Sequence, residues 1–455
     1  MEKTLGNKSE IAEEKYVSPY FPEYVRTRID DPGLDEKIKG LTSEKIEMVI
    51  KSVIGNSSAK IKAAIETCMH CGLCSDACHH YLSNDRDPTY APVAKIRMTL
   101  GEMIKRNFKV DPEFIKFCAR IVFTECNACH RCSMYCPFGI DIAALIGKVR
   151  RICFLLGIVP YILMDTAQSL ATTLTQLWIS QADWIDTAQW MEEELSAEIK
   201  EAYIPINKEG VDVLYIPLGT EPKLVPQYIA VMAKIMSYAG VNWSYSLHDY
   251  AQASMFVQDL ITMQRIAKEI FEEAKKLRPK KMVATECGHA LYGTFIMAPP
   301  LLGYKNLPFE VLHAVEFYYE LVKTGRLKIV RKIKEPVTVH EPCNLVRRKG
   351  AGDKLRYLVK EMCEDFREMY PSDGHNFCCN AGGSVIACGP PWKKARVKNA
   401  RVKAEQIKNT GAKIIIAPCH NCHTQIHDLI KAYNIDAEVK FMWDILFETI
   451  ETPFV

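Results

Sequence analysis

The chain has 455 residues, with 58 Lys plus Arg and 55 Asp plus Glu, which gives a formal net charge of +3. At roughly 150 residues per domain this length predicts about three domains. The near-neutral charge argues against a dedicated nucleic-acid-binding protein, because such proteins usually carry a strong basic excess. Eighteen cysteines without an apolar leader at the N-terminus favour metal or redox chemistry over structural disulfides.

The first 210 residues divide into three parts, and the sequence predicts helices but no strands in them. Residues 1–45 are polar and interrupted by prolines, so we expect an extended N-terminal arm with short helices. Residues 46–150 hold two cysteine clusters among helical patterns and predict a helical di-cluster domain. Residues 151–210 form a helical linker or docking region with Trp178, Trp184 and Trp190. That region either docks on a membrane partner or the lipid headgroups, or covers the following domain as a buried helix.

From about residue 211 the sequence pattern changes to short runs of β-branched residues, each of which ends in a turn and leads into a predicted helix. Four such runs are VDVLYIPLG (211–219), KKMVATECG (280–288), EPVTVHEPC (335–343) and AKIIIAPCH (412–420). This alternation is typical of α/β units with a parallel sheet. The similarity of the runs predicts two copies of one module, a degenerate copy at 211–330 and an intact copy at 331–455. The fold class is therefore α+β and multidomain, an all-α ferredoxin-like domain followed by two α/β modules in tandem.

Two cysteine runs share one spacing, C-x2-C-x2-C-x3-C. They are Cys68, Cys71, Cys74 and Cys78, and then Cys126, Cys129, Cys132 and Cys136. In two-cluster ferredoxins the fourth cysteine of each run ligates the other cluster. We therefore predict one [4Fe–4S] cluster on Cys68, Cys71, Cys74 and Cys136, and a second on Cys126, Cys129, Cys132 and Cys78. Zinc is the alternative, although it prefers paired C-x2-C knuckles. His79 stands after Cys78, where Pro is usual.

Five further cysteines lie in the last 120 residues. These five stand in motifs, whereas Cys363 and Cys388 of the same stretch do not. The five are Cys343, the adjacent pair Cys378 and Cys379, and Cys419 and Cys422. Adjacent cysteines rarely ligate one mononuclear metal, because the chain between them is too short to relax. They suit a cluster with a bridging thiolate or an open, non-cubane shape. Strand ends converge at the usual ligand crevice of an α/β sheet, so these turns are expected to meet.

The order of these motifs resembles that of the heterodisulfide reductase D-type subunits and of the DsrK-like subunits in the transmembrane redox complexes of sulfate reducers. The resemblance covers about residues 60–450 and rests on HEPCN, CCNAGG and APCHNCH. Asn380 departs from the Gly that gives this "CCG" domain its name. The resemblance implies that the five cysteines hold an atypical [4Fe–4S] cluster that splits a disulfide. It also implies a cytoplasmic protein, peripheral on the inner face of the cell membrane.

Several residues outside the cluster motifs are candidates for the same site. His340, His420 and His423 flank the cysteine turns and titrate near neutral pH, so they could supply protons; the alternative is ordinary capping or surface histidines. Cys287 occupies the turn equivalent to Cys419 and is expected to line the active site rather than ligate iron. Cys118, Cys153, Cys363 and Cys388 are interpreted as small buried hydrophobes.

Two functions remain open. The first is the catalytic subunit of a membrane-associated disulfide reductase, with electrons from a quinol or an integral-membrane cytochrome b-type partner. Its substrate would be a heterodisulfide, a trisulfide or a disulfide on a small DsrC-like sulfur-carrier protein. The second is an electron-transfer subunit of a quinone-linked dehydrogenase of the glycerol-3-phosphate or lactate type.

Overall fold

The computed structural model describes residues 34–199 and 203–450, which form two compact units. Unit 1 contains the described residues up to Gln168, together with Ala253–Asp259 and Phe377–Glu405. Unit 2 contains Ser169–Gln252, Leu260–Asn376 and the described residues from Gln406 onward. Most of the predicted N-terminal arm, residues 1–33, lies outside the described residues.

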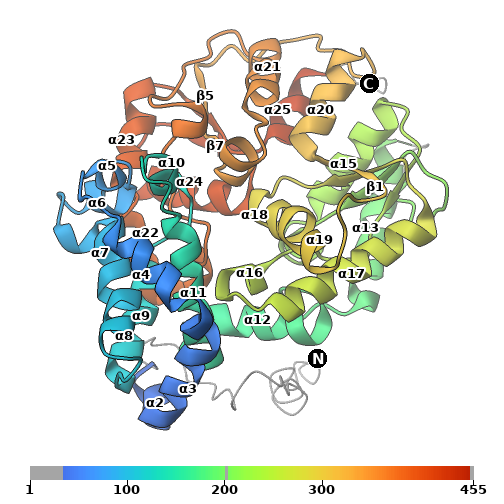
Figure 1. Ribbon diagram of the computed structural model, residues 1–455. Helices are drawn as coiled ribbons and strands as arrows, with labels where there is room; N and C mark the ends of the chain where they lie inside the picture. The colour runs from blue at the N-terminus through green and yellow to red at the C-terminus, as the bar shows by residue number, and fades with distance from the viewer. Residues whose placement is uncertain (1–33, 200–202, 451–455) are drawn as a thin grey trace, which may run out of the picture. The chain divides into compact units, whose positions relative to one another are not determined.

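The described residues of unit 1 form helices joined by loops, with no strand among them (Figure 1). Its helices are α2 (Leu34–Ile38), α3 (Ser43–Ile54), α4 (Ser58–Glu66), α5 (Leu73–Asp76), α6 (His79–Ser83), α7 (Pro92–Ile96), α8 (Glu102–Lys105), α9 (Pro112–Thr124), α10 (Arg131–Met134), α11 (Ile142–Leu155), α16 (Ala253–Val257) and α22 (Lys393–Lys398). Two more helices, α12 (Tyr161–Thr173) and α23 (Arg401–Thr410), begin in unit 1 and end in unit 2.

The long helices of unit 1 begin at residues that satisfy free backbone N–H groups. The Asp111 carboxylate accepts a hydrogen bond from Phe114 N at 2.8 Å at the start of α9, where Pro112 occupies the first helical position. Asp141 accepts from Ala144 N at 3.1 Å at the start of α11. The apolar faces of α9 and α11 pack on each other in the core of the unit.

Unit 2 holds two parallel sheets. The first has the strand order β2-β1-β3-β4, with β1 (Val213–Ile216), β2 (Trp243–Tyr245), β3 (Lys281–Ala284) and β4 (Glu310–His313). The second has the order β5-β6-β7, with β5 (Val337–Val339), β6 (Ile414–Ile416) and β7 (Glu438–Lys440). Every pair of neighbouring strands is parallel. The predicted α/β units with parallel pairing are thus confirmed.

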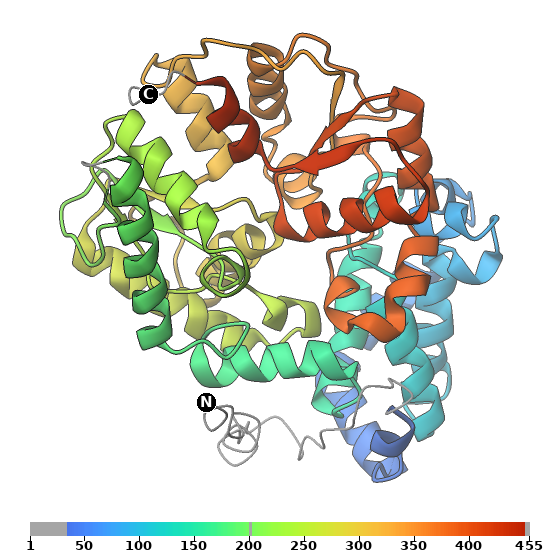
Figure 2. The same ribbon diagram turned by 180° about the vertical axis from the view of Figure 1, so that it is seen from behind.

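The helices of unit 2 are α13 (Gln181–Glu198), α14 (Thr220–Leu224), α15 (Gln227–Tyr238), α17 (Leu260–Leu277), α18 (Gly288–Tyr292), α19 (Ala298–Leu301), α20 (Ala314–Lys323), α21 (Gly352–Met362), α24 (His420–Ala432) and α25 (Met442–Thr449). Figure 2 shows the C-terminal helices α24 and α25 in shades of red beside the second sheet. One apolar cluster contains side chains of β1, β3, β5 and β6, so the two sheets share a core.

The two sheets repeat one strand order. Strands β1, β3 and β4 are neighbours in the first sheet, as β5, β6 and β7 are in the second. The position of β2 beside β1 has a counterpart in an isolated parallel bridge between Val337 and Phe366. Such a shared order is what a duplicated module would produce. Residues Phe377–Glu405, which were expected in the second module, group with unit 1.

The tryptophans of the predicted docking region have different environments. Trp184 of α13 is buried in the core of unit 2, whereas Trp190 of the same helix is exposed. Around Trp184, α13 is therefore a buried helix that covers the α/β domain, which was the second of the two alternatives predicted for this region. Among the described residues, no helix is both long enough and apolar enough to cross a membrane.

Candidate functional site

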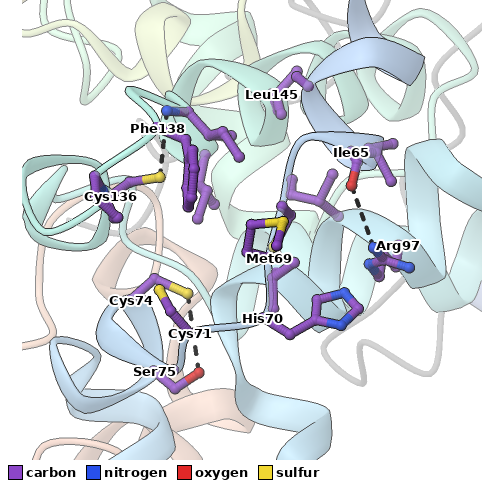
Figure 3. A pocket seen from close by; sticks show the side chains of 18 residues that line it. Ile65, Met69, His70, Cys71, Cys74, Ser75, Arg97, Cys136, Phe138 and Leu145 are labelled. Carbon is purple, nitrogen blue, oxygen red and sulfur yellow. Dashed lines mark hydrogen bonds between the residues drawn. The ribbon is translucent and has the colours of Figure 1, made fainter.

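The first cysteine cavity lies in unit 1 between the two ferredoxin-type runs. Four cysteines line it: Cys68, Cys71, Cys74 and Cys136. Figure 3 shows Cys71, Cys74 and Cys136 around this cavity, together with Met69 and Phe138. The cavity volume is about 120 Å³, and Cys71 is exposed to solvent. Gly72, at a φ of +83°, lets the chain turn from Cys71 into α5.

A second cavity of unit 1 collects the other four cysteines of the runs. Its lining includes Cys78, Cys126, Cys129 and Cys132. Burial raises the pKa of the Cys132 thiol well above its ordinary value, and the nearby Cys129 and Cys78 thiols raise it further. Four thiolates in this space therefore need a cationic centre to hold them. A set of soft sulfur ligands suits an iron–sulfur cluster or zinc, so the residues present fit the predicted group.

Each cavity contains three cysteines of one run and the fourth cysteine of the other. Cys136 lies with the first three cysteines of the earlier run, and Cys78 lies with those of the later run. Backbone N–H groups also point at the sulfurs: Ile140 N donates to Cys136 Sγ and Ala128 N donates to Cys126 Sγ, each at 3.4 Å. This is the placement that crossed ligation requires; the ligation itself stays a prediction.

The adjacent cysteines belong to unit 1 as well. Cys378 and Cys379 are buried, and Asn380 N donates to Cys378 Sγ at 3.4 Å. One ring nitrogen of His79 and the sulfurs of Cys129 and Cys378 all lie within 4.8 Å of one another. The cysteine pair therefore stands next to a predicted ligand of the second cavity.

Unit 2 brings three cysteine turns together. The turn after β3 carries Cys287, the turn after β5 carries Cys343, and the turn after β6 carries Cys419 and, in the first turn of α24, Cys422. A Cβ built on Gly288 would lie 3.1 Å from Asn344 Cβ, so the first two turns are in direct contact. The thiols of Cys287 and Cys422 hydrogen-bond to Cys419 and lower the pKa of its thiol well below the ordinary value.

Cys287 has the surroundings of a site residue. It is fully buried, and its Sγ lies 3.0 Å from Nδ1 of His289. The Tyr250 hydroxyl donates to the carbonyls of Thr285 at 2.8 Å and of Cys287 at 3.4 Å, which fixes the turn. Cys287 was predicted to occupy the turn equivalent to Cys419, and the two thiols are in contact. Its role in catalysis stays a prediction.

The three candidate histidines differ in environment. Burial lowers the pKa of His420, whose backbone N and Nδ1 both donate to the Glu286 carbonyl at 3.0 Å. His423 stacks on Phe441, with ring centroids 4.1 Å apart, and burial lowers its pKa to about 4. His340 is buried at the end of β5, where its backbone N donates to the Ile416 carbonyl at 2.8 Å. His420 and His423 are thus neutral at pH 7 and can donate N–H hydrogen bonds without carrying charge.

The sequence did not predict two buried ionisable residues near the cysteines, Glu286 and Arg150. Glu286, fully buried, accepts from Met442 N at 3.0 Å and Trp443 N at 2.9 Å and so joins the two modules of unit 2. Arg150, also buried, donates to the carbonyls of Cys126 at 2.7 Å and Gly383 at 2.6 Å. Neither residue lies in a spacing that a motif describes. The presence of Glu286 beside Cys287 in an otherwise apolar strand end was the available signal.

Comparison with protein families now gives the class to which these features correspond. Residues 64–140 match the family model of a 4Fe-4S dicluster domain. Residues 337–427 match the model of the CCG cysteine-rich domain. The chain is thus an iron–sulfur protein with a dicluster domain followed by a cysteine-rich domain, and [4Fe–4S] clusters are its indicated cofactors.

The relatives make the resemblance more specific. The chain is 22% identical over 437 residues to the "Hdr-like menaquinol oxidoreductase iron-sulfur subunit 2" of Archaeoglobus fulgidus, covering 83% of this chain and 78% of that one. It is 25% identical over 401 residues to the D-type subunit of the dihydromethanophenazine:CoB--CoM heterodisulfide reductase of Methanosarcina mazei, covering 85% and 94%. It is also 24% identical to the "EtfAB:quinone oxidoreductase" of Syntrophomonas wolfei, covering 72% of this chain but 46% of that one. The predicted resemblance is confirmed.

Proposed function

We propose that this chain is the catalytic iron–sulfur subunit of a membrane-associated disulfide reductase. The observation that carries the proposal is the position of the adjacent cysteines. Cys378 lies within 4.8 Å of Cys129, so a centre on the cysteine pair adjoins the ferredoxin-type centres inside unit 1. Electrons that pass through the ferredoxin-type centres could therefore reach a catalytic centre on the cysteine pair. The names of the relatives from Archaeoglobus and Methanosarcina point to the same class of complex.

The proposed ligand sets follow the two cavities and the five-cysteine motif. Two [4Fe–4S] clusters would be held by Cys68, Cys71, Cys74 and Cys136, and by Cys78, Cys126, Cys129 and Cys132. One atypical [4Fe–4S] cluster would be held by Cys343, Cys378, Cys379, Cys419 and Cys422. When bound, such clusters supply one-electron steps. Because Cys71 is exposed, the first cavity is the side at which a partner would deliver electrons.

The proposed reaction is the reduction of a disulfide. One disulfide, two electrons and two protons give two thiols, and the electrons arrive one at a time from a quinol through a cytochrome b-type membrane subunit. The substrate class is a heterodisulfide, a trisulfide or the disulfide of a DsrC-like carrier protein. His340 flanks the cysteine turns and is the proposed hydrogen-bond donor to the leaving sulfurs. The single N–H of neutral His420 is donated to the Glu286 carbonyl, so His420 is proposed to orient the turn that carries Cys419 and Cys422. This assignment places the chain in the cytoplasm, peripheral on the inner face of the membrane.

The second candidate is an electron-transfer subunit of a quinone-linked dehydrogenase. The similarity to an EtfAB:quinone oxidoreductase and to the "Probable iron-sulfur-binding oxidoreductase FadF" of Bacillus subtilis supports it. In that role the chain would pass electrons on and would not bind a disulfide. The chain spans less than half of each of these two relatives, which leaves their other segments without a counterpart here.

One experiment separates the two candidates. The protein is reconstituted anaerobically, iron and sulfide are counted, and EPR spectra of the oxidised protein are recorded with and without added thiol. A reductase with three clusters should bind about twelve iron atoms per chain and show a thiol-sensitive signal. It should also reduce a heterodisulfide with reduced viologen as electron donor. About eight iron atoms, no thiol-sensitive signal and no turnover would instead support the electron-transfer subunit.

A further inference from the structure

The two positions at which the cysteine motifs depart from their usual pattern are in contact in unit 1. His79 replaces the Pro that usually follows the fourth cysteine of a ferredoxin run, and Asn380 replaces the Gly that usually follows the CC pair. The Nε2 of His79 lies 3.2 Å from Oδ1 of Asn380. Both residues are buried, and 301 positions of sequence separate them. A hydrogen bond therefore joins the two residues that depart from the usual motifs, His79 and Asn380.

Asn380 keeps the backbone shape of the glycine it replaces. Its φ of 70° lies in the left-handed region, which Gly adopts freely and which Asn tolerates better than most residues. Its side chain adds what Gly lacks: Nδ2 donates to the Arg396 carbonyl at 2.8 Å, and Oδ1 accepts from His79. The amide is thus held in one orientation.

His79 is held by a second amide as well. Its Nε2 lies 3.0 Å from Oδ1 of Asn127, which also accepts from Nε2 of His80 at 2.8 Å. The Nδ2 of Asn127 donates to the Gly382 carbonyl at 2.8 Å, so the amide oxygen must face the imidazoles. Because both amide oxygens only accept, Nε2 of His79 carries a hydrogen.

The surrounding chain fixes this contact tightly. A Cβ on Gly383 would lie only 1.9 Å from the Asn127 carbonyl oxygen, so a side chain there has no space. Arg150 also donates to carbonyls on both sides of this contact, those of Cys126 and Gly383. The segment with the cysteine pair and the second ferredoxin-type run are therefore one packed layer, and the His79 ring lies within 4.8 Å of the sulfurs of Cys129 and Cys378.

We propose that the His79–Asn380 hydrogen bond is the bridge that positions the cysteine pair for electron transfer from the centre of Cys78, Cys126, Cys129 and Cys132. The proposal rests on the proposed function, which places centres on both cysteine sets. A cluster held by the four ferredoxin-type cysteines would supply one electron in each transfer and a cluster on the cysteine pair would accept it, so two transfers would serve one disulfide. His79 and Asn380 act through the cysteines and are positioning residues.

The chain offers variants that should fold. His79→Pro puts Pro at the first position of α6, where a missing N–H is harmless, and Asn380→Gly relaxes a left-handed residue. The double variant carries the usual residue at both positions. Asn399→Ala is the matched control, because Asn399 Oδ1 accepts from Asn84 Nδ2 at 2.7 Å and so links the same two segments by another buried hydrogen bond.

The measurement is freeze-quench EPR of the full holoprotein after a one-electron pulse from a photoreductant, which follows electron transfer to the thiol-sensitive centre. Either single variant should slow this transfer about tenfold, as loss of a supporting hydrogen bond around a metal ligand commonly does. The double variant should be no slower than the singles, because the two residues act as a unit. Iron content should be equal in every variant, and Asn399→Ala should transfer at the wild-type rate.

Three results would contradict the proposed role of the His79–Asn380 hydrogen bond. They are unchanged transfer rates in the single variants, an equally reduced rate in Asn399→Ala, or additive reductions of the rate in the double variant. An extra tightly bound metal ion that disappears in His79→Pro would also contradict that role, because His79, Cys129 and Cys378 would then be a metal site of their own. A wild-type protein without a thiol-sensitive signal would contradict the proposed function instead. The two failures are therefore distinguishable.

Discussion

The turns after β3 and β6 have nearly the same backbone but carry different chemistry. In each, a cysteine precedes the first residue of a helix, with φ and ψ of −147° and 104° at Cys287 and −167° and 124° at Cys419. In each, the cysteine N–H donates to the carbonyl two residues earlier, at 2.6 Å and 2.7 Å. The second module adds Cys422 in the first turn of α24 and Cys343 in the turn after β5, whereas the first module has no motif cysteine besides Cys287.

This comparison shows that the module fold does not depend on its cysteines. The first module has the same strand order and an apolar core although it retains one motif cysteine. In the region where the second module carries Cys343 after its first strand, the first module has the buried carboxyl of Glu221. The retained cysteine, Cys287, is the one whose thiol contacts Cys419. Cys287 therefore lies where the two modules meet.

The largest effect is expected when the adjacent pair Cys378 and Cys379, which groups with unit 1, loses one cysteine. Cys379→Ser should abolish disulfide reduction and the thiol-sensitive EPR signal, while the reduced signals of the two ferredoxin-type clusters persist. The reason is that Cys379 lies outside both ferredoxin-type cavities. Cys388→Ser is the control, since Cys388 is a buried cysteine of the same segment that belongs to no motif. Wild-type turnover in Cys379→Ser would show that the five-cysteine site is not catalytic.

Much of this comparison could be predicted from the sequence, because it depends on local pattern. The four β-branched runs are all strands, since alternation of apolar strands with helices is a local signal. Strands β2, β4 and β7 were not predicted, because they do not end in the turn residues that marked the four β-branched runs. The spacing also predicted which cysteines line each ferredoxin-type cavity, because the fourth cysteine of each short run lies with the first three cysteines of the other run.

Long-range partners could not be predicted in the same way. The grouping of Phe377–Glu405 with unit 1 depends on contacts such as that of Ser384 Oγ with the Phe123 carbonyl, 2.8 Å and 261 positions apart. No periodicity encodes such a pairing. The one available signal was the departure from the motif at His79 and Asn380, and its meaning emerges only when the two side chains are seen in contact.

A smaller effect is expected from the retained cysteine of the first module. Cys287→Ser should lower turnover about tenfold without loss of iron, because Cys287 supports Cys419 by a hydrogen bond rather than as a ligand. Iron and sulfide analysis with steady-state kinetics checks this. Cys363→Ser, at a buried cysteine outside every motif, should leave both quantities unchanged. Loss of about four iron atoms per chain in Cys287→Ser would make it a ligand and erase the difference between the modules.

The contact between the first two turns should be sensitive to a single methyl group. In Gly288→Ala the new Cβ would lie 3.1 Å from Asn344 Cβ and 3.3 Å from Leu345 N, so the Cys343 turn must shift. We expect a loss of about 1–3 kcal/mol in the free energy of unfolding, visible as a lower anaerobic melting temperature. Gly382→Ala is the matched control, because a Cβ there meets no atom within 4 Å. Equal melting temperatures for the two variants would show that the turns have room to move apart.

An effect on the pH dependence of stability alone is expected from the carboxyl of Glu221 in the first module. Burial raises the pKa of Glu221 to about 8, even though the Tyr215 hydroxyl donates to Oε2 at 3.3 Å. The Thr285 side chain also lowers the pKa, and Leu218 N and His420 Nε2 lie 3.5 Å and 3.8 Å from Oε1. Between its ordinary value near 4.5 and about 8, the folded protein therefore holds a proton that the unfolded chain has released.

The sign of the pH effect follows from that proton. The contribution of Glu221 to stability is complete below about pH 4.5 and is lost as the pH rises through about 8. Glu221→Gln cannot ionise, so the melting temperature of the variant should rise relative to wild type as the pH goes from 5 to 8. The difference in unfolding free energy over that range is at most about 4 kcal/mol. Glu193→Gln, at an exposed carboxylate of α13, should follow the wild-type pH profile. If Glu221→Gln follows it too, the buried carboxyl is ionised in the folded protein, and the first module carries a fixed negative charge in the region where the second carries a cysteine.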